Sequence, residues 1–112
     1  MNHKICSLLG LAMRAGKLKH GEDAVLQVIR NEQAKLVFVA TDASDSTFKK
    51  MSDKCTFYKV TLRQIATREE LGTCIGKEAR VTLAVIDGGF AKSILNLLDN
   101  ENEVDHIEKR KR

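Results

Sequence analysis

The chain has no proline and no tryptophan, and aromatic residues occupy only 4% of its 112 positions. No apolar run approaches the ~20 residues that a membrane-spanning helix needs, and the first residues lack the long apolar region of a secretory signal. Without proline, internal repeats or a linker, the sequence favours one compact domain. We therefore expect a cytoplasmic single-domain protein that makes no contact with a membrane.

Cysteine and histidine are few and scattered. The cysteines at 6, 55 and 74 include no C-x-x-C pair, which argues against a zinc site or a disulfide framework. No histidine stands at metal-ligand spacing, and His3 and Cys6 do not complete a nucleophile–base set. We predict no metal, no cofactor, no catalytic residue and no disulfide, with the cysteines serving as small buried hydrophobic residues.

Two loops could carry chemistry, and neither has a complete pattern. The segment Gly72–Glu78 has three residues between its glycines and a glutamate after the lysine, whereas a P-loop needs four residues and then Ser or Thr. This excludes nucleotide binding of that type and leaves either a ligand-contact loop or an ordinary surface turn. Asp42 follows a buried strand as either a catalytic acid or a helix cap, and we favour the cap.

Positive charge is what the chain has in excess. Its formal net charge is +4 and its pI is about 9.1. The last thirteen residues carry four acids and four bases, so the excess lies in residues 1–99. The first twenty residues contain no acid and four bases, which are Lys4, Arg14, Lys17 and Lys19. Such a local excess favours a polyanionic partner.

Hydrophobic periodicity predicts helices that alternate with strands. The expected helices are at 3–15, 21–30, 45–54, 67–72 and 90–98, and the expected strands are at 17–19, 36–40, 56–60 and 81–86. The two central strands are apolar on both faces, which requires helices on both sides of the sheet. The expected fold is α/β, a three-layer α/β/α sandwich with a small mixed four-stranded sheet over residues 1–99. Residues 100–112 are expected to form a charged, flexible tail.

The segment 17–23 carries the most specific signal. It places two lysines, then Gly21, Glu22 and Asp23, at a predicted helix start. Free N–H groups at a helix start suit phosphates and base edges, although acids there also simply stabilise the helix. With Gln27 one turn later, the carboxylates could accept hydrogen bonds from a guanine while the lysines hold phosphates. The scarcity of aromatics argues against a base-stacking sheet of the RRM type.

Over residues 5–99 the chain resembles the kink-turn RNA-binding family of ribosomal proteins, and it is most similar to the small bacterial members. The resemblance rests on motifs in matching order, namely Leu8–Lys17, Gly21–Asp23, Ala34–Val37, Ala40–Ala43, and Glu70–Gly72 followed by Gly76-Lys77. It implies an α/β/α fold and a non-enzymatic, monomeric protein. The implied partners are a kink-turn or related bent RNA, such as ribosomal RNA, and ribosomal or ribonucleoprotein proteins.

The resemblance also implies roles for individual residues. The glycine before the second helix admits the bent RNA backbone, and the first turns read tandem sheared G·A pairs, at positions that fall on Gly21, Glu22, Asp23, Ala24 and Gln27. The loop before the last strand covers a flipped-out nucleotide, and it maps to Gly76, Lys77, Glu78 and Ala79. Phosphate neutralisation is assigned to Lys17, Lys19 and Lys77.

The alternatives come from departures from the family pattern. Archaeal members carry Glu and Lys where this chain has Ala24 and Gln27, so a protein–protein adaptor on the same fold remains a second hypothesis. The fold class also occurs as an appendage of RNA methyltransferases. This chain has no cofactor loop, so the enzyme hypothesis is not favoured.

Overall fold

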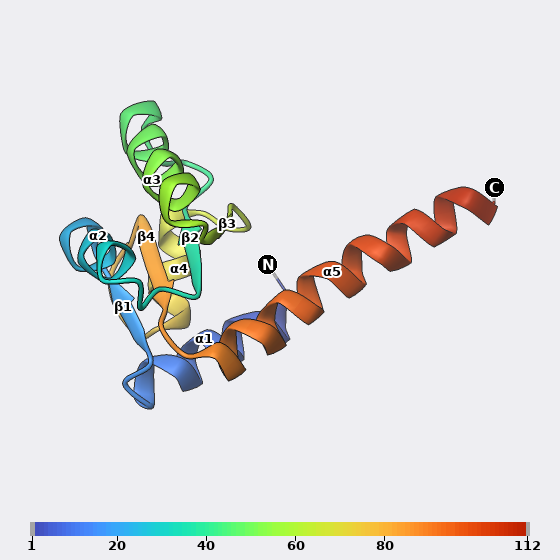
Figure 1. The fold of residues 1–112 in the computed structure, drawn as a ribbon. Helices are drawn as coiled ribbons and strands as arrows, with labels where there is room; N and C mark the ends of the chain where they lie inside the picture. Colours follow the sequence, from blue (N-terminus) through green and yellow to red (C-terminus); the bar gives the residue numbers. More distant parts are fainter. Residues whose placement is uncertain (1, 112) are drawn as a thin grey trace.

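The computed structural model describes the backbone of residues 2–111 and the side chains of residues 2–100. In this part of the chain the helices are α1 His3–Arg14, α2 Glu22–Arg30, α3 Asp45–Tyr58, α4 Arg68–Cys74 and α5 Gly88–Lys111. The strands are β1 Leu18–His20, β2 Leu36–Val39, β3 Thr61–Arg63 and β4 Thr82–Val85. Helices cover both faces of the sheet (Figure 1), which confirms the predicted α/β/α sandwich. None of the helices in this part of the chain combines the length and the apolar character needed to cross a bilayer.

The sheet is mixed, with the strand order β1-β4-β2-β3. β4 pairs antiparallel with both β1 and β2, and β3 pairs parallel with β2. All residues of β2 and β4 are buried, as expected for central strands covered on both faces. This order places β1 at an edge beside β4, so the chain leaves β1 for α2 next to the start of β4.

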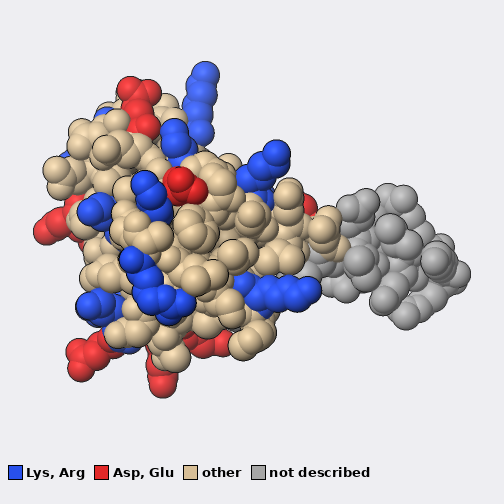
Figure 2. Space-filling view, turned by 90° about the horizontal axis from the view of Figure 1, so that it is seen from below, with Lys and Arg blue, Asp and Glu red and all other residues tan. Residues whose placement is uncertain are grey.

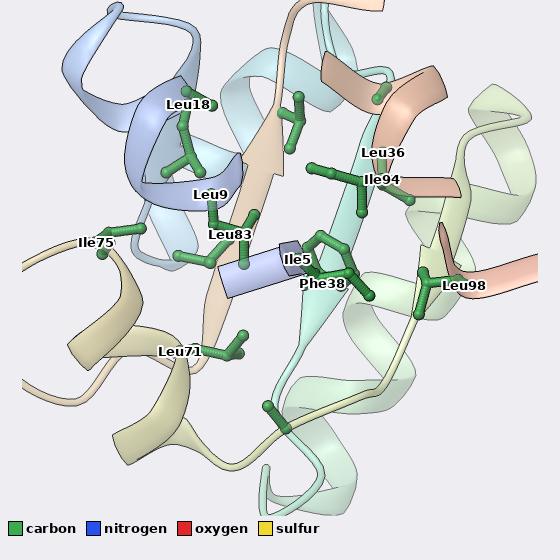
Figure 3. Packing of buried hydrophobic residues seen from close by; sticks show 14 of the residues in the cluster. Ile5, Leu9, Leu18, Leu36, Phe38, Leu71, Ile75, Leu83, Ile94 and Leu98 are labelled. Atoms are coloured by element: carbon green, nitrogen blue, oxygen red, sulfur yellow. The ribbon is translucent and has the colours of Figure 1, made fainter. Parts of the chain in front are cut away.

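Alternate residues of the central strands enter two separate cores. Leu36 and Phe38 of β2 pack with α1, α4 and α5, whereas Val37 and Val39 pack with α2 and α3. Figure 3 shows Ile5 of α1 beside Phe38 in the first of these cores. The period-2 alternation of strand side chains thus fixes which helices lie on which face.

Side-chain caps define two helix starts. The hydroxyl of Ser44 accepts a hydrogen bond from the Thr47 amide at the start of α3 (3.2 Å). At the start of α4, Thr67 and Glu70 form the reciprocal capping box that satisfies two free backbone donors.

Asp42 is a helix cap, in agreement with the favoured interpretation. Its Oδ1 accepts a hydrogen bond from the amide of Arg68, the first residue of α4 (3.0 Å), and its Oδ2 lies 3.4 Å from Nε of the same arginine. The amide hydrogen bond, followed by the arginine charge, holds the pKa of Asp42 below its usual value. The side chain therefore ties the loop after β2 to α4.

The predicted strand at 56–60 is wrong. α3 continues to Tyr58, because the buried residues Met51 and Cys55 keep the helical spacing of the side that faces the sheet. The helix ends at Lys59, whose left-handed backbone (φ 59°) redirects the chain into β3. The β-branched and aromatic residues of this segment favoured a strand, and helical packing overrides that preference.

α4 also ends later than predicted. The sequence indicated a stop near Gly72, but the helix continues to Cys74. Gly72 is needed for packing instead, because a Cβ at this position would collide with the carbonyl group of Glu78. Gly76, with φ 72°, makes the left-handed turn that ends the helix.

α5 begins at Gly88, two residues before the predicted start at 90. It begins early because Oδ2 of Asp87 accepts a hydrogen bond from the Phe90 amide (2.9 Å), which is the geometry of a helix cap. The helix ends at Lys111, so the backbone of the tail at 100–112 is helical up to that residue. The side chains of residues 101–112 lie outside the described residues, and the flexibility of the tail stays a prediction.

The prediction that the chain forms no disulfide is wrong. Cys6 in α1 and Cys74 at the end of α4 are joined by an S–S bond, with Cα atoms 5.1 Å apart and a sequence separation of 68. The two residues meet only because α1 packs on α4, where Gly10 leaves room for the carbonyl oxygen of Cys74. Cys55 is free and buried as predicted, and burial raises its pKa to about 11.

Candidate nucleic-acid interface

The start of α2 is open to solvent at Gly21. Its φ of 92° lies in the left-handed region, which favours glycine over other residues. The Gly21 amide donates to the carbonyl oxygen of Thr82 (3.1 Å) and fixes the helix start to the sheet. A Cβ on Gly21 would have no atom within 4 Å. The tip of α2 is therefore accessible to a ligand, and it presents the amides of the first helical turn.

The polar residues of α2 differ in their surroundings. Glu22 is held by α3, because its Oε2 lies 2.7 Å from Nζ of Lys50. Asp23 and Gln27 are exposed and lie one turn apart on the same side of the helix. Within the described part of the chain, the Asp23 carboxylate forms no ion pair, whereas Ala24 beside it is half-buried. Asp23 and Gln27 are thus the side chains of α2 that are available to a partner.

The loop that follows α4 is held firmly on that helix. The amides of Gly76 and Lys77 donate to the carbonyl oxygens of Thr73 and Gly72, at 3.1 and 2.9 Å. Gly72 allows the backbone at Glu78 to lie directly against α4. The predicted loop residues, from Gly76 to Ala79, are all exposed. Their backbone is therefore positioned by α4 while their side chains face solvent.

Arg80 joins this loop to β1. Its Nε donates to Nδ1 of His20 (3.0 Å), and its Nη1 donates to the carbonyl oxygens of Ala79 (3.0 Å) and Glu78 (3.3 Å). His20 directly precedes Gly21, so this one guanidinium connects the loop to the tip of α2. The two segments predicted to form the site, 57 to 60 residues apart in the chain, are brought together in this way.

Three cations surround His20. Burial lowers the pKa of His20, and the charges of Arg80, Lys77 and Lys19 lower it further, in that order. A histidine whose charged form is disfavoured by three cations marks a point of concentrated positive potential. Lys and Arg are also spread over the underside of the molecule near α1 and α5, with acids mainly toward its margins (Figure 2). The surface is therefore suited to a polyanion.

Comparison with known proteins places this arrangement in a family. Residues 3–96 match the model of the ribosomal protein L7Ae/L30e/S12e/Gadd45 family. The chain belongs to this family. It is 54% identical over 92 residues to the RNA-binding protein YlxQ of Bacillus subtilis (strain 168), a match that covers 82% of this chain and 92% of that protein.

Two solved structures show the same fold. A protein of unknown function from Bacillus halodurans C has a TM-score of 0.84 at 41% identity, with 88% of this chain and 99% of that chain covered. A Giardia lamblia 15.5kD RNA binding protein has a TM-score of 0.75 at 16% identity, covering 89% and 92%. The resemblance inferred from the sequence is thus confirmed. The named relatives are RNA-binding and ribosomal proteins rather than enzymes, as predicted.

In this L7Ae-family chain, the predicted lysines do not all lie at one place. Lys19 and Lys77 both act on His20, whereas the Lys17 carbonyl oxygen accepts from the Ile86 amide at the opposite end of β1. Lys17 therefore lies about 10 Å along the strand from the tip of α2, at ~3.3 Å per residue. It belongs to the margin of the site.

Three residues of the interface were missed by the sequence analysis: His20, Arg80 and Lys50. Arg80 follows directly on the predicted loop 76–79 and could have been included with it. His20 was dismissed because it had no partner nearby in the sequence, and its partner stands 60 positions away. No pattern in the sequence indicates that Lys50 of α3 reaches Glu22.

The environment of His20 predicts a measurable shift. We expect His20 to titrate below its ordinary pKa of 6.5, because burial and neighbouring cations both disfavour the imidazolium. Replacing Arg80 with alanine should raise that pKa, as followed by NMR of the imidazole protons. Lys35→Ala is the matched control, since it removes an exposed cation at the other end of the sheet. A wild-type pKa at or above 6.5 would contradict the described cluster.

Proposed function

We propose that the protein binds RNA and recognises a kink-turn, a helix–internal loop–helix with tandem sheared G·A pairs. The observation that carries this proposal is the convergence of Lys19, Lys77 and Arg80 around His20, beside the open tip of α2. The printed name of the Bacillus relative, an RNA-binding protein, supports it. As further parts of the proposal, the protein is a cytoplasmic monomer that associates with ribosomes or other ribonucleoproteins.

The proposed mechanism divides the work between charge and shape. Lys19 and Lys77 neutralise phosphates, and the amides at the start of α2 face the bent backbone where Gly21 leaves space. Asp23 and Gln27 contact base edges of the G·A pairs, because they are the exposed polar residues on that side of α2. The remaining assignments are Glu22 held in place by Lys50, Ala24 beside it, Lys17 at the margin, and Gly76, Glu78 and Ala79 covering an extruded nucleotide.

The decisive experiment compares a kink-turn RNA with the same strand lacking its G·A pairs. We expect at least tenfold tighter binding of the intact kink-turn in a gel-shift titration. Three phosphate contacts predict that affinity falls roughly 40-fold between 50 and 200 mM salt, since counterions are released at each contact. Equal affinity for the two RNAs would refute kink-turn recognition, and affinity that is flat with salt would refute the phosphate contacts.

Two acidic residues test the assignment of the face. Asp23→Ala should weaken the complex about tenfold, the effect of losing one hydrogen bond from a charged group. Glu69→Ala is the matched control, because Glu69 is an exposed acid on α4 outside the proposed face. If the two substitutions change affinity equally, Asp23 does not read the RNA.

A second candidate function is a protein–protein adaptor. Phe57 at the end of α3 is 76% exposed, and large apolar side chains on a surface are enriched where proteins bind one another. Protein partners that survive ribonuclease treatment in a pull-down, and that are lost with Phe57→Ser, would favour this function over RNA binding.

A further inference from the structure

The Cys6–Cys74 bond lies beneath the loop of the proposed RNA face and is open to small molecules. Both cysteines are half-buried, and both line two adjoining cavities of about 350 and 370 Å³. His3 and Thr73 line the same two cavities. The sulfur atoms are therefore placed where a small thiol or disulfide can approach them.

The third cysteine provides an internal contrast. Cys55 is free, fully within the core between α2 and α3, and only 2% exposed. Burial raises its pKa to about 11, so it carries little thiolate at neutral pH. Accessibility and thiol chemistry are thus confined to the pair that joins α1 to α4.

The pair also controls an anchor of the loop. Cys74 is the last residue of α4, and the turn that follows places Gly76 and Lys77 through hydrogen bonds to Thr73 and Gly72. A cross-link from Cys74 to α1 therefore holds the end of the helix from which the loop begins. Without the cross-link, the short helix α4 is tied to α1 by packing alone.

We propose that Cys6 and Cys74 form a reversible thiol–disulfide site that exchanges with low-molecular-weight disulfides, and that its redox state sets how firmly the loop 75–80 is held. The proposal rests on the proposed cytoplasmic location, where protein disulfides are typically transient or redox-sensing. Its consequence for RNA binding rests on the proposed function.

The exchange balances without a metal or a cofactor. The Cys6 thiolate attacks one sulfur of a small disulfide RSSR, the S–S bond of RSSR breaks, and RS⁻ leaves to take up a proton. The Cys74 thiolate then attacks the Cys6 sulfur of the mixed disulfide and releases the second RS⁻. Two protein thiols are oxidised, and one RSSR is reduced to two RSH. Cys6 is the attacking residue because it lies in the N-terminal half of α1, whereas Cys74 lies at the C-terminal end of α4.

The first measurement is independent of RNA. The full chain is equilibrated with defined ratios of reduced and oxidised glutathione, and free thiols are alkylated and counted by mass spectrometry. We expect two thiols to appear together as the ratio becomes more reducing, and Cys55→Ala to retain this two-thiol transition. Cys74→Ser should show no cross-link at any ratio. If the wild type keeps both thiols free at every ratio, or keeps them joined at every ratio, the proposal is overturned.

The second measurement reads the loop and then the RNA. Hydrogen exchange at the Gly76 and Lys77 amides should be at least tenfold faster in the reduced protein, with no change at the Ile29 amide of α2. Unchanged loop exchange would overturn the link to the loop. Affinity for a kink-turn RNA should then fall about 3- to 10-fold on reduction, because a preorganised loop binds at lower entropic cost, and Cys74→Ser should not respond. If RNA binds in neither state, the proposed function fails while thiol counts and loop exchange still decide the redox proposal.

Discussion

Replacing Arg80 with alanine is expected to weaken binding of a kink-turn RNA about 10- to 150-fold. The guanidinium donates to the carbonyl oxygens of Glu78 and Ala79 and to the His20 ring, so its removal frees the loop as well as removing a charge. Charge-assisted hydrogen bonds of this kind contribute roughly 1.5–3 kcal/mol each, which corresponds to that range of affinity. Isothermal titration calorimetry at constant salt measures the change.

Two further variants separate the fork geometry from the charge. Arg80→Lys keeps the charge but cannot bridge three acceptors, so we expect most of the loss to remain. Arg30→Ala removes an exposed cation from the last turn of α2, at the end away from Gly21, and should change affinity less than threefold. Equal losses from Arg80→Ala and Arg30→Ala would mean that only net charge matters.

The fold was largely predictable because its strongest signals are periodic. Leu36–Val39 is a continuous apolar strand, and the buried positions of α1 follow helical spacing, so the layers follow from hydrophobic pattern alone. The pattern failed at residues 56–58. There, strand-forming residues continue a helix, because packing of α3 against the sheet outweighs local preference.

The site was predictable only where its residues are adjacent in the chain. Gly21, Glu22 and Asp23 form one helix start and could be found together. The ion pair of Glu22 with Lys50 and the hydrogen bond of His20 with Arg80 join residues 28 and 60 positions apart. Such pairs depend on how the sheet orders its strands, and a single sequence contains no signal for them. The same limit applies to the Cys6–Cys74 bond.

Loss of the Cys6–Cys74 cross-link is expected to lower the free energy of unfolding by about 4 kcal/mol. The bond closes a loop with a sequence separation of 68. In the chain-entropy model, a closed loop of that size removes roughly this much free energy from the unfolded ensemble. Because whole domains are stable by only about 5–15 kcal/mol, the change is a large part of the total. Urea unfolding of Cys6→Ser, compared with the oxidised wild type, measures it.

A double-substitution cycle isolates the cross-link from the side chains themselves. Once Cys6 is serine, the bond is already absent, so adding Cys74→Ser should cost only a few tenths of a kcal/mol more and the two single costs should not add. Reductant should lower the stability of the wild type and of Cys55→Ala by similar amounts, because both keep the pair, and should leave Cys6→Ser unchanged. A wild type that unfolds at the same urea concentration with and without reductant would show that the bond contributes nothing in solution. Additive single costs would assign the loss to packing at the contact of α1 with α4 rather than to chain entropy.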